Sequence, residues 1–281
     1  MPNLSVIDPG FYTTIQDAGR FGYRSLGVPI SGPVDFESFE IAKKLVGNYG
    51  NQALLECTLK GPKLLFGGTT WVAVSGAPMV ISLNDQKMQM NQAFKCRLGD
   101  LLHLENCVAG MRTYIAFAGG LQSPIYMKSR SYFSPVSPQS KINKADVLSF
   151  DEAFEDPVKT RRRKYPFLDF SKSQIEVSPG PEWDLLSKEE QNTILKATFE
   201  VGSNDRMGYR LHGKTPKTSY QIDSTTILPG FIQLTPDGVL LVAMMDAQIT
   251  GGYPRILILH PEAQCLLAQK RSGDQLRLKI M

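Results

Sequence analysis

The octapeptide RLGDLLHL at Arg97–Leu104 reads like RSGDQLRL at Arg271–Leu278, close to the other end of the chain. Each copy places an arginine before Gly-Asp and then alternates leucine with other residues. A glycine-containing turn followed by alternating apolar residues is typical of a tight turn that leads into a half-buried β-strand. The repetition favours a chain with two similar lobes built mainly from strands.

Short apolar or alternating runs continue this pattern around both octapeptides, and turn signals such as Gly67-Gly68 and Asp237-Gly238 bound many of them. Many short strands between glycine-rich turns are typical of a barrel or a sandwich. The sequence therefore predicts a mainly β fold. The predicted strands include Trp71–Val74, Val80–Leu83, Leu101–Leu104, Tyr114–Ala118, Gly238–Met244 and Ile256–Leu259.

Three short helices are predicted among the strands, as covers over the sheets. The first runs from Pro33 to Val46 and stops at Gly47, a good C-terminal signal. The second begins after Ser187, which with Glu190 three residues later forms a capping box. The third opens with Pro261 in its first turn and ends near Gly273.

The length of 281 residues exceeds the usual size of one hydrophobic core, so two β-rich domains are expected. The stretch from Ser134 to Ser178 is rich in proline, serine and charge, with little apolar periodicity. We place the boundary there, with the first lobe and its linker at residues 1–160 and the second lobe at 161–281. A hydrophobic content of 42% argues against a disordered or fibrous chain.

Charge and cysteine usage limit the classes of partner and compartment. The 31 basic residues barely exceed the 27 acidic ones, so neither nucleic acid nor a membrane surface is implied. The four cysteines are widely spaced without a CxxC pair, which signals neither a zinc site nor a disulfide framework. Because no signal peptide or run of transmembrane length is present, we expect a cytoplasmic protein.

No complete catalytic signature stands in the sequence: GxSxG, HExxH, a Walker loop and GxGxxG are all absent, and the three histidines are scattered. What remains are polar clusters in glycine-rich segments, at Thr13–Gly32, Ser203–Leu211 and Asp246–Arg255. Arginine reads carboxylate or phosphate with two hydrogen bonds, and adjacent glycines let backbone amides approach an anion. These clusters suit a small anionic substrate, although Asp-Arg pairs also commonly tie loops together.

Motifs spread along nearly the whole chain carry a resemblance to a known family. The chain resembles the biotin-dependent-carboxyltransferase-like family, which includes the C-type subunit of 5-oxoprolinase, also described as allophanate hydrolase subunit 2, and one half of the urea carboxylase carboxyltransferase domain. The motifs are DPGFYTTIQDAGRFGYRSLGVPISGPVD (residues 8–35), LVGN (45–48), VSGA (74–77), YIAFAGG (114–120), SRS (129–131), SNDRMGYRL (203–211), GFIQ (230–233) and QITGGYPRI (248–256).

The resemblance implies a mainly β fold with a few short helices, arranged as two cyclophilin-like β-barrel lobes. It implies one component of a heteromeric hydrolase, an ATP-dependent 5-oxoprolinase that converts 5-oxo-L-proline to L-glutamate, and a component that is inactive without its partners. The implied partners are the B-type subunit of 5-oxoprolinase, which is KipI-like, and the A-type subunit, which is LamB/YcsF-like. ATP is the implied co-substrate of the complex.

Carried onto this chain, the resemblance directs attention to polar residues of the three clusters, with no metal ligand among their expected roles. The arginines are expected to bind the substrate carboxylate or nucleotide phosphates. The candidate catalytic residues are Asp205, Arg206 and Gln248, and the candidate substrate-binding residues are Arg210, Thr250, Tyr253, Arg255, Asp17 and Arg20.

Two alternatives stay open. One is a carboxyltransferase component that acts on urea or a related amide with carboxybiotin. Because Met88-Gln89-Met90 lacks the lysine of a biotinyl carrier, no covalently bound biotin is expected on this chain. The other is a KipA-like regulator that binds a histidine-kinase inhibitor. Val239-Leu240 and Ile249 depart from the residues expected of the family, which leaves the wall of the pocket and the substrate open.

Overall fold

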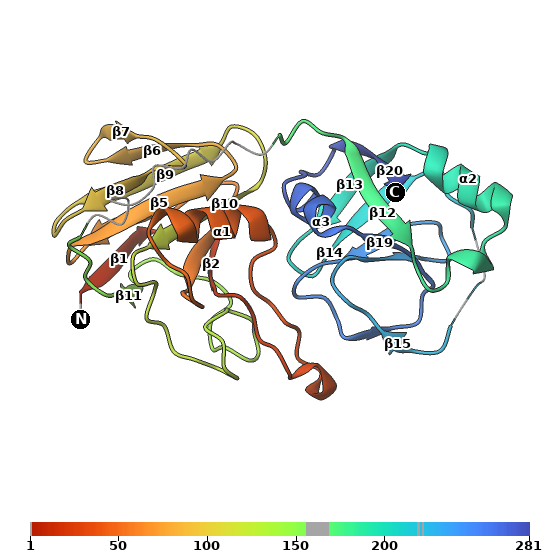
Figure 1. The fold of residues 1–281 in the computed structure, drawn as a ribbon, viewed down its shortest axis with the longest axis horizontal. Helices are drawn as coiled ribbons and strands as arrows, with labels where there is room; N and C mark the ends of the chain where they lie inside the picture. The colour runs from red at the N-terminus through yellow and green to blue at the C-terminus, as the bar shows by residue number, and fades with distance from the viewer. Residues whose placement is uncertain (1, 156–168, 218–219, 221) are drawn as a thin grey trace. The chain divides into compact units, whose positions relative to one another are not determined.

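A computed structural model describes residues 2–155, 169–217, 220 and 222–281. The chain divides into two compact units (Figure 1). The first consists of the described residues of Met1–Phe21 and Ser31–Leu168, and the second of Gly22–Ile30 and the described residues of Asp169–Met281. The predicted boundary at residues 160 and 161 lies outside the described residues.

The first unit contains two antiparallel sheets around a shared apolar core. One sheet has the order β11-β1-β4-β9-β6-β7 and the other β2-β3-β10-β5-β8. Leu4, Phe66, Ile81 and Ile115 are among the core side chains, each at most 1% exposed. The elements are β1 (Asn3–Asp8), β2 (Tyr12–Gln16), α1 (Phe36–Leu45), β3 (Leu54–Thr58), β4 (Lys63–Phe66), β5 (Thr70–Gly76), β6 (Met79–Leu83), β7 (Gln86–Met88), β8 (Ala93–Cys96), β9 (Leu101–Cys107), β10 (Arg112–Phe117) and β11 (Val147–Ser149).

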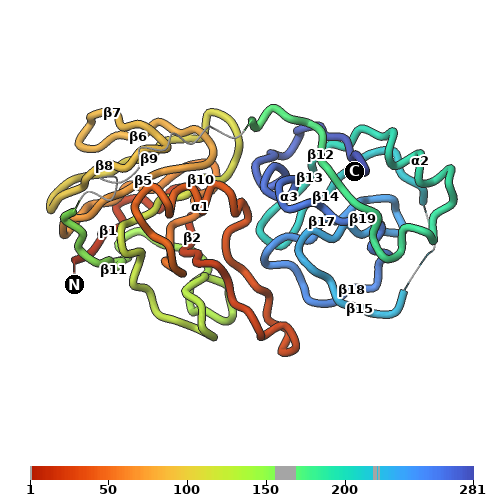
Figure 2. The backbone as a smooth tube through the Cα atoms, in the orientation of Figure 1, coloured from red at the N-terminus to blue at the C-terminus, as the bar shows by residue number. Residues whose placement is uncertain are grey.

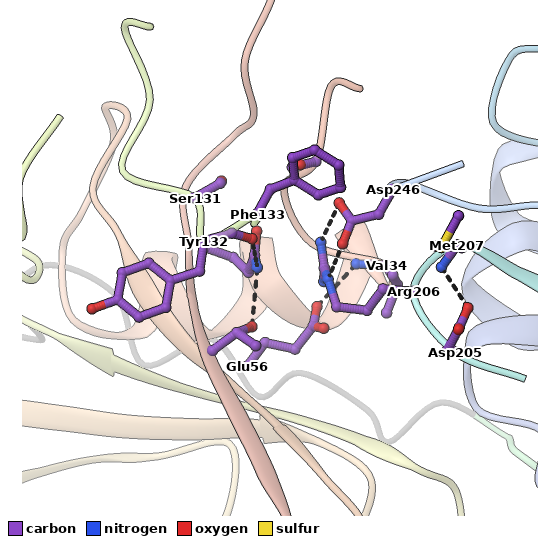
Figure 3. A network of polar contacts seen from close by, with 12 residues as sticks. Val34, Glu56, Ser131, Tyr132, Phe133, Asp205, Arg206, Met207 and Asp246 are labelled. Atoms are coloured by element: carbon purple, nitrogen blue, oxygen red, sulfur yellow. Dashed lines mark hydrogen bonds and ion pairs between the residues drawn. The ribbon is translucent and has the colours of Figure 1, made fainter. Parts of the chain in front are cut away.

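Helix α1 packs across β5 and β10, as Figure 1 shows. Asp35 caps its first turn by accepting a hydrogen bond from the Ser38 backbone N–H at 3.1 Å. The segment before the helix is fixed by a buried carboxylate, because Glu56 Oε2 accepts a hydrogen bond from the Val34 N–H at 3.0 Å (Figure 3). The same oxygen accepts from the Tyr114 hydroxyl at 2.7 Å. The predicted helix is confirmed, within three residues at its start.

The second unit contains a closed barrel of seven strands in the order β12-β19-β16-β17-β14-β13-β20. The parallel pairing of β12 with β20 joins strands from the two ends of this unit's sequence. The elements are η1 (Arg24–Leu26), β12 (Gln174–Pro179), η2 (Trp183–Leu185), α2 (Lys188–Lys196), β13 (Phe199–Asn204), β14 (Gly208–Gly213), β15 (Thr225–Thr226), β16 (Phe231–Leu234), β17 (Leu240–Ala243), β18 (Thr250–Gly251), β19 (Arg255–Leu259), α3 (Pro261–Ala268) and β20 (Gln275–Ile280). The mainly β prediction is confirmed.

The two octapeptides form matching turns, one in each unit. In the first, the Asp100 N–H donates to Arg97 O at 3.0 Å, and Asp100 Oδ2 accepts from the Arg97 N–H at 2.7 Å. In the second, Asp274 makes the same two bonds to Arg271, at 3.0 and 2.8 Å. The glycine before each aspartate has a positive φ, 86° and 91°, which side chains disfavour. The repeat in the sequence is therefore a repeat in the structure.

The other two predicted helices are also confirmed. Ser187 and Glu190 form the complete capping box of α2, in which each side chain accepts from the other residue's backbone. Pro261 lies in the first turn of α3, which ends at Ala268, before the predicted Gly273. Each helix in the described part of the chain is too short or too polar to cross a membrane.

Candidate functional site

A pocket of about 310 Å³ lies on the barrel of the second unit. Three neighbouring strands, β14, β17 and β16, form its floor, and the end of β13 and the segments around β15 and β18 form its walls. The lining residues are Ser203, Asn204, Asp205, Met207, Gly208, Tyr209, Arg210, Ile227, Gln233, Leu241, Val242, Ala243, Ala247 and Gln248.

The register of the strands explains why the guanidinium of Arg210 and the side-chain amide of Gln233 both lie on the floor of the pocket. Arg210 on β14 pairs with Leu241 on β17, which in turn pairs with Gln233 on β16. Directly paired residues project to the same face of a sheet. The adjacent pair, Tyr209 and Val242, is at most 2% exposed and fills the barrel. The row of Arg210 therefore faces outward, and the exposed guanidinium points away from the apolar interior.

The end of β13 contributes a carboxylate in a fixed position. Asp205 Oδ1 accepts hydrogen bonds from the backbone N–H groups of Met207 at 2.7 Å and Gly208 at 3.0 Å. Figure 3 shows the first of these bonds. Such a bond between an aspartate and the residue two positions later is a local turn that orients the side chain. The other carboxylate oxygen of the exposed Asp205 is left for solvent or a ligand.

Asn204, next to Asp205, holds an unsatisfied polar atom beside the pocket. Its Nδ2 donates to Gly202 O at 3.2 Å, while its buried Oδ1 accepts no hydrogen bond within the described chain. A buried acceptor without a partner costs about 1–3 kcal/mol, and such atoms are rare in folded proteins. The unpaired Oδ1 of Asn204 therefore lowers the free energy of unfolding.

A small second layer covers part of the floor. β15 and β18 pair as a two-stranded sheet and lie side by side in Figure 2. Ile227, Ala243 and Ala247 pack together and line the pocket, so it has an apolar wall as well as a polar one. The carbonyl of Ile227 accepts a hydrogen bond from Arg24, which ties the segment Gly22–Ile30 to this unit.

Arg206 is held by an ion pair and does not line the pocket. Its Nε donates to Asp246 Oδ2 at 2.7 Å and its Nη2 to Oδ1 at 3.3 Å, with side-chain exposures of 5% and 9% (Figure 3). A backbone bond from the Asp246 N–H to Arg206 O, at 2.9 Å, reinforces the contact. This two-pronged, buried geometry is that of a structural tie.

Arg255 is likewise paired with a carboxylate. Its Nε and Nη2 donate to the two oxygens of Glu182 at 2.8 and 2.6 Å, and its Nη1 donates to Thr226 O at 3.0 Å. The guanidinium also lies over the Phe231 ring, 5.5 Å from its centroid. The hydrogen bond from Arg255 holds the pKa of Glu182 below its usual value of 4.5.

This pKa shift predicts a pH dependence of stability. A carboxylate whose pKa is lowered by folding adds stability that is fully present above 4.5 and is lost as the pH falls through the folded-state pKa. We expect wild type to exceed Glu182→Gln in free energy of unfolding at about pH 7 and to lose that advantage by about pH 3, measured by urea unfolding. Glu200→Gln, at an exposed position of β13, is the control. An advantage that stays constant with pH would contradict the prediction.

Asp17 and Arg20 belong to the first unit, where they form a buried polar cluster with the SRS motif. Asp17 accepts hydrogen bonds from the hydroxyls of Ser129 and Ser131 at 2.6 and 2.7 Å and from the Arg130 N–H at 2.7 Å. Arg20 is fully buried and donates to Ser131 O at 2.7 Å. These bonds fix the 129–131 segment against the end of β2.

The pocket thus gathers three of the predicted site residues, Asp205, Arg210 and Gln248. Besides Arg255, the third cluster holds two more candidates. Thr250 is exposed on β18, and the Tyr253 carbonyl accepts a hydrogen bond from Nε2 of the pocket residue Gln233 at 3.1 Å. In the part of the chain that the structure describes, no group of three or more His, Cys, Asp or Glu could hold a metal ion.

Gln233 is a polar pocket residue that was not among the site residues predicted from the sequence. Its side chain is 4% exposed, within the otherwise apolar strand β16. The sequence did contain a signal, because Gln233 is the one polar residue in an apolar strand. A buried amide needs hydrogen-bonding partners for both its donor and its acceptor, so such a residue is a candidate for a ligand contact. The run instead supported only the prediction of a strand.

Comparison with known proteins identifies the class. A family model described as the carboxyltransferase domain, subdomain A and B, matches residues 26–280. The chain belongs to this carboxyltransferase-domain family, as its motifs predicted. Among its relatives is the C subunit of the 5-oxoprolinase of Escherichia coli, 33% identical over 96% of this chain and 89% of that protein. The urea amidolyase of Lachancea kluyveri is 44% identical over 76% of this chain, but over only 13% of its own length.

Solved structures agree with this assignment. The crystal structure of TTHA0988 superposes with a TM-score of 0.89 and 29% identity over 99% of this chain. The urea amidolyase of K. lactis gives the same TM-score and identity over 98%. This chain spans 55% of the first solved chain and 18% of the second.

Proposed function

We propose that this chain is the C subunit of a heteromeric ATP-dependent 5-oxoprolinase, and that it acts with a B-type and an A-type subunit in the cytoplasm. One observation carries the proposal. The two relatives named as C subunits of 5-oxoprolinase, from Escherichia coli and Haemophilus influenzae, match 96% and 99% of this chain over 89% and 91% of their own lengths.

The proposed reaction has a physical reason to need ATP. The lactam of 5-oxo-L-proline is stabilised by resonance between nitrogen and carbonyl. Transfer of the γ-phosphoryl group to the carbonyl oxygen makes the ring carbon a better electrophile. Water then adds to that carbon, the C–N bond breaks and the nitrogen takes up a proton, which leaves an acyl phosphate. A second water molecule hydrolyses the acyl phosphate to L-glutamate and phosphate. The whole change consumes one ATP and two water molecules for each ring opened.

The pocket of the second unit supports a role in holding such a substrate. Arg210 offers a guanidinium for the substrate carboxylate, and Ile227 and Ala247 offer an apolar wall for the ring methylenes. Asp205 and Gln248 remain the candidates for orienting the reacting groups. Arg206 and Arg255 have the weaker claim to bind substrate, because their guanidinium groups already pair with carboxylates.

A second candidate function is supported by the 44% identity to a urea amidolyase, which exceeds the 33% identity to the Escherichia coli protein. In that reading the chain is part of a carboxyltransferase that acts on urea or a related amide, with carboxybiotin supplied by another protein. The two candidates differ in substrate charge, because urea is neutral and 5-oxoproline carries a carboxylate.

The test is glutamate formation from 5-oxo-L-proline and ATP by this chain co-purified with its A-type and B-type subunits, each omitted in turn. We expect glutamate only when all three are present. Arg210→Met is expected to lower kcat/KM by about 10- to 100-fold, the worth of one charged hydrogen-bonding partner. The exposed Arg97→Met, outside the pocket lining, is the matched control and should leave kcat/KM unchanged.

A stable complex that never releases glutamate would overturn the proposal. Carboxyl transfer from carboxybiotin to urea by the same preparation would then favour the second candidate. Equal effects of Arg210→Met and Arg97→Met would leave the proposed role in 5-oxoprolinase in place and remove Arg210 from the substrate site.

A further inference from the structure

Two glutamine side chains that line the pocket, those of Gln233 and Gln248, approach the same glycine, Gly251 on β18. A Cβ atom added at Gly251 would lie 2.9 Å from Nε2 of Gln233 and 3.3 Å from Nε2 of Gln248. A real Cβ essentially never approaches another atom within 3.0 Å. The missing side chain at position 251 is therefore what lets the two carboxamides lie together beside the pocket.

The two carboxamides retain hydrogen-bonding capacity. Gln233 Nε2 donates to Tyr253 O at 3.1 Å, but Gln233 Oε1 accepts nothing from the described residues. The side chain of Gln248 makes no hydrogen bond with the described residues and is exposed in the pocket lining. An amide that is 4% exposed, like Gln233, normally satisfies both of its ends. The pocket thus presents one oriented acceptor and one complete carboxamide.

A primary carboxamide is complementary to a cis amide. In a five-membered lactam, the ring forces the N–H and C=O groups onto the same edge, where one carboxamide can accept from the first and donate to the second. Open-chain secondary amides are almost always trans and present these groups on opposite sides. Paired hydrogen bonds with a glutamine side chain therefore select lactams over peptides.

Arg210 adds a charge to the same surface. It lies on the row Arg210–Leu241–Gln233 of the pocket floor, two strands away from Gln233. Its charge helps to lower the pKa of Asp237, after the larger effect of the hydrogen bond from Thr235, but Arg210 and Asp237 form no ion pair within 4.0 Å among the described residues. A ligand carboxylate can therefore reach the guanidinium without displacing a protein partner.

We propose that Gln248 and Gln233 recognise the cis amide edge of the ligand while Arg210 binds its carboxylate, so that the pocket is specific for small lactam acids. This inference rests on the proposed function in one respect: the proposed function names 5-oxoproline as the lactam acid that the protein binds in the cell. It makes urea a poor ligand, because urea offers the amide edge without the charge.

The experiment measures binding of four probes to the purified full chain by isothermal titration calorimetry. The probes are 5-oxo-L-proline, 2-pyrrolidinone without the carboxylate, the lactone analogue in which oxygen replaces the ring N–H, and urea. We expect 5-oxo-L-proline to bind about 10- to 100-fold more tightly than each of the other three, since each lacks a hydrogen-bonding partner or leaves one unsatisfied.

Two variants separate the two recognition elements. Arg210→Met should abolish the preference for 5-oxo-L-proline over 2-pyrrolidinone and keep the preference over the lactone. Gln248→Met should abolish the preference for 5-oxo-L-proline over the lactone and keep the preference over 2-pyrrolidinone. Gly251→Ala should weaken all ring ligands, because the new methyl group displaces both carboxamides. Arg97→Met and Gln275→Met, at exposed positions outside the lining, are the matched controls.

Unchanged selectivity in both pocket variants would overturn the inference, as would equal losses for all probes in variants and controls. If the free chain binds none of the probes, the same comparison is made from inhibition constants on the complete complex, and absence of inhibition there also overturns it. Glutamate formation with unchanged selectivity would sink this inference and leave the proposed function standing. Selective binding of lactam acids without glutamate formation would support this inference and contradict the proposed function.

Discussion

Replacing Asp246 with alanine will lower the free energy of unfolding of the second unit by about 3–5 kcal/mol, the usual cost of removing one partner of a buried ion pair. The Arg206 guanidinium, 5% exposed, would lose its two-pronged partner and keep its charge in a poorly solvated place. Urea unfolding followed by Trp183 fluorescence in a Trp71→Phe background reports on this unit alone, because the two tryptophans of the chain lie in different units.

The matched control is the exposed ion pair of Lys60 and Asp8, whose side chains are each 40% exposed. Because this pair lies in the first unit, Asp8→Ala is followed by Trp71 fluorescence in a Trp183→Phe background. It should cost less than about 1 kcal/mol, because solvent screens exposed pairs. The double variant Arg206→Met with Asp246→Leu should recover most of the stability lost in Asp246→Ala. A loss in Asp246→Ala as small as that of the control would show that Arg206 does not depend on Asp246, and would revive its role in binding substrate.

The second large effect is expected at Asp17. Asparagine in its place keeps one oxygen but turns the other into an amide that faces the donors of Arg130 N and Asn51 Nδ2, at 2.7 and 3.3 Å. Asp17→Asn should therefore destabilise the first unit by about 3 kcal/mol, since hydrogen bonds to a charged group contribute about 1.5–3 kcal/mol each. Trp71 fluorescence in a Trp183→Phe background measures the loss.

The control for this substitution is Asp85→Asn, at an exposed turn position with φ 64°, where asparagine is equally well accommodated. It should change the unfolding free energy by no more than about 0.5 kcal/mol. If Asp17→Asn leaves stability unchanged while the complete complex loses glutamate formation, Asp17 contacts substrate as its motif suggested, and the structural interpretation is wrong.

The features that could be predicted from the sequence are those whose physics is local. The capping box of Ser187 and Glu190, Pro261 in a first turn and the two Gly-Asp turns all involve residues within a few positions of one another. Alternating apolar residues predicted strands because side-chain direction has a period of two. The family assignment followed from motifs and is confirmed by the family model over residues 26–280.

The pairing of charged and polar groups that lie far apart in the chain could not be predicted from the sequence. Arg206 and Arg255 looked like anion-binding groups, but their partners Asp246 and Glu182 come from other strands and turns. Gln233 looked like an ordinary strand residue because only the register of β14, β17 and β16 aligns it with Arg210. Non-local pairing of this kind leaves no periodic trace.

The assignment of Gly22–Ile30 to the second unit has a consequence for how this chain can be divided during evolution or in the laboratory. The described chain changes from one unit to the other after Phe21, after Ile30 and again between residues 155 and 169, so neither unit is a continuous stretch of sequence. A gene split near residue 168 would leave the segment of Arg24 on the wrong fragment and the carbonyl of Ile227 without its donor. Recombination can therefore exchange the two units together more readily than either alone.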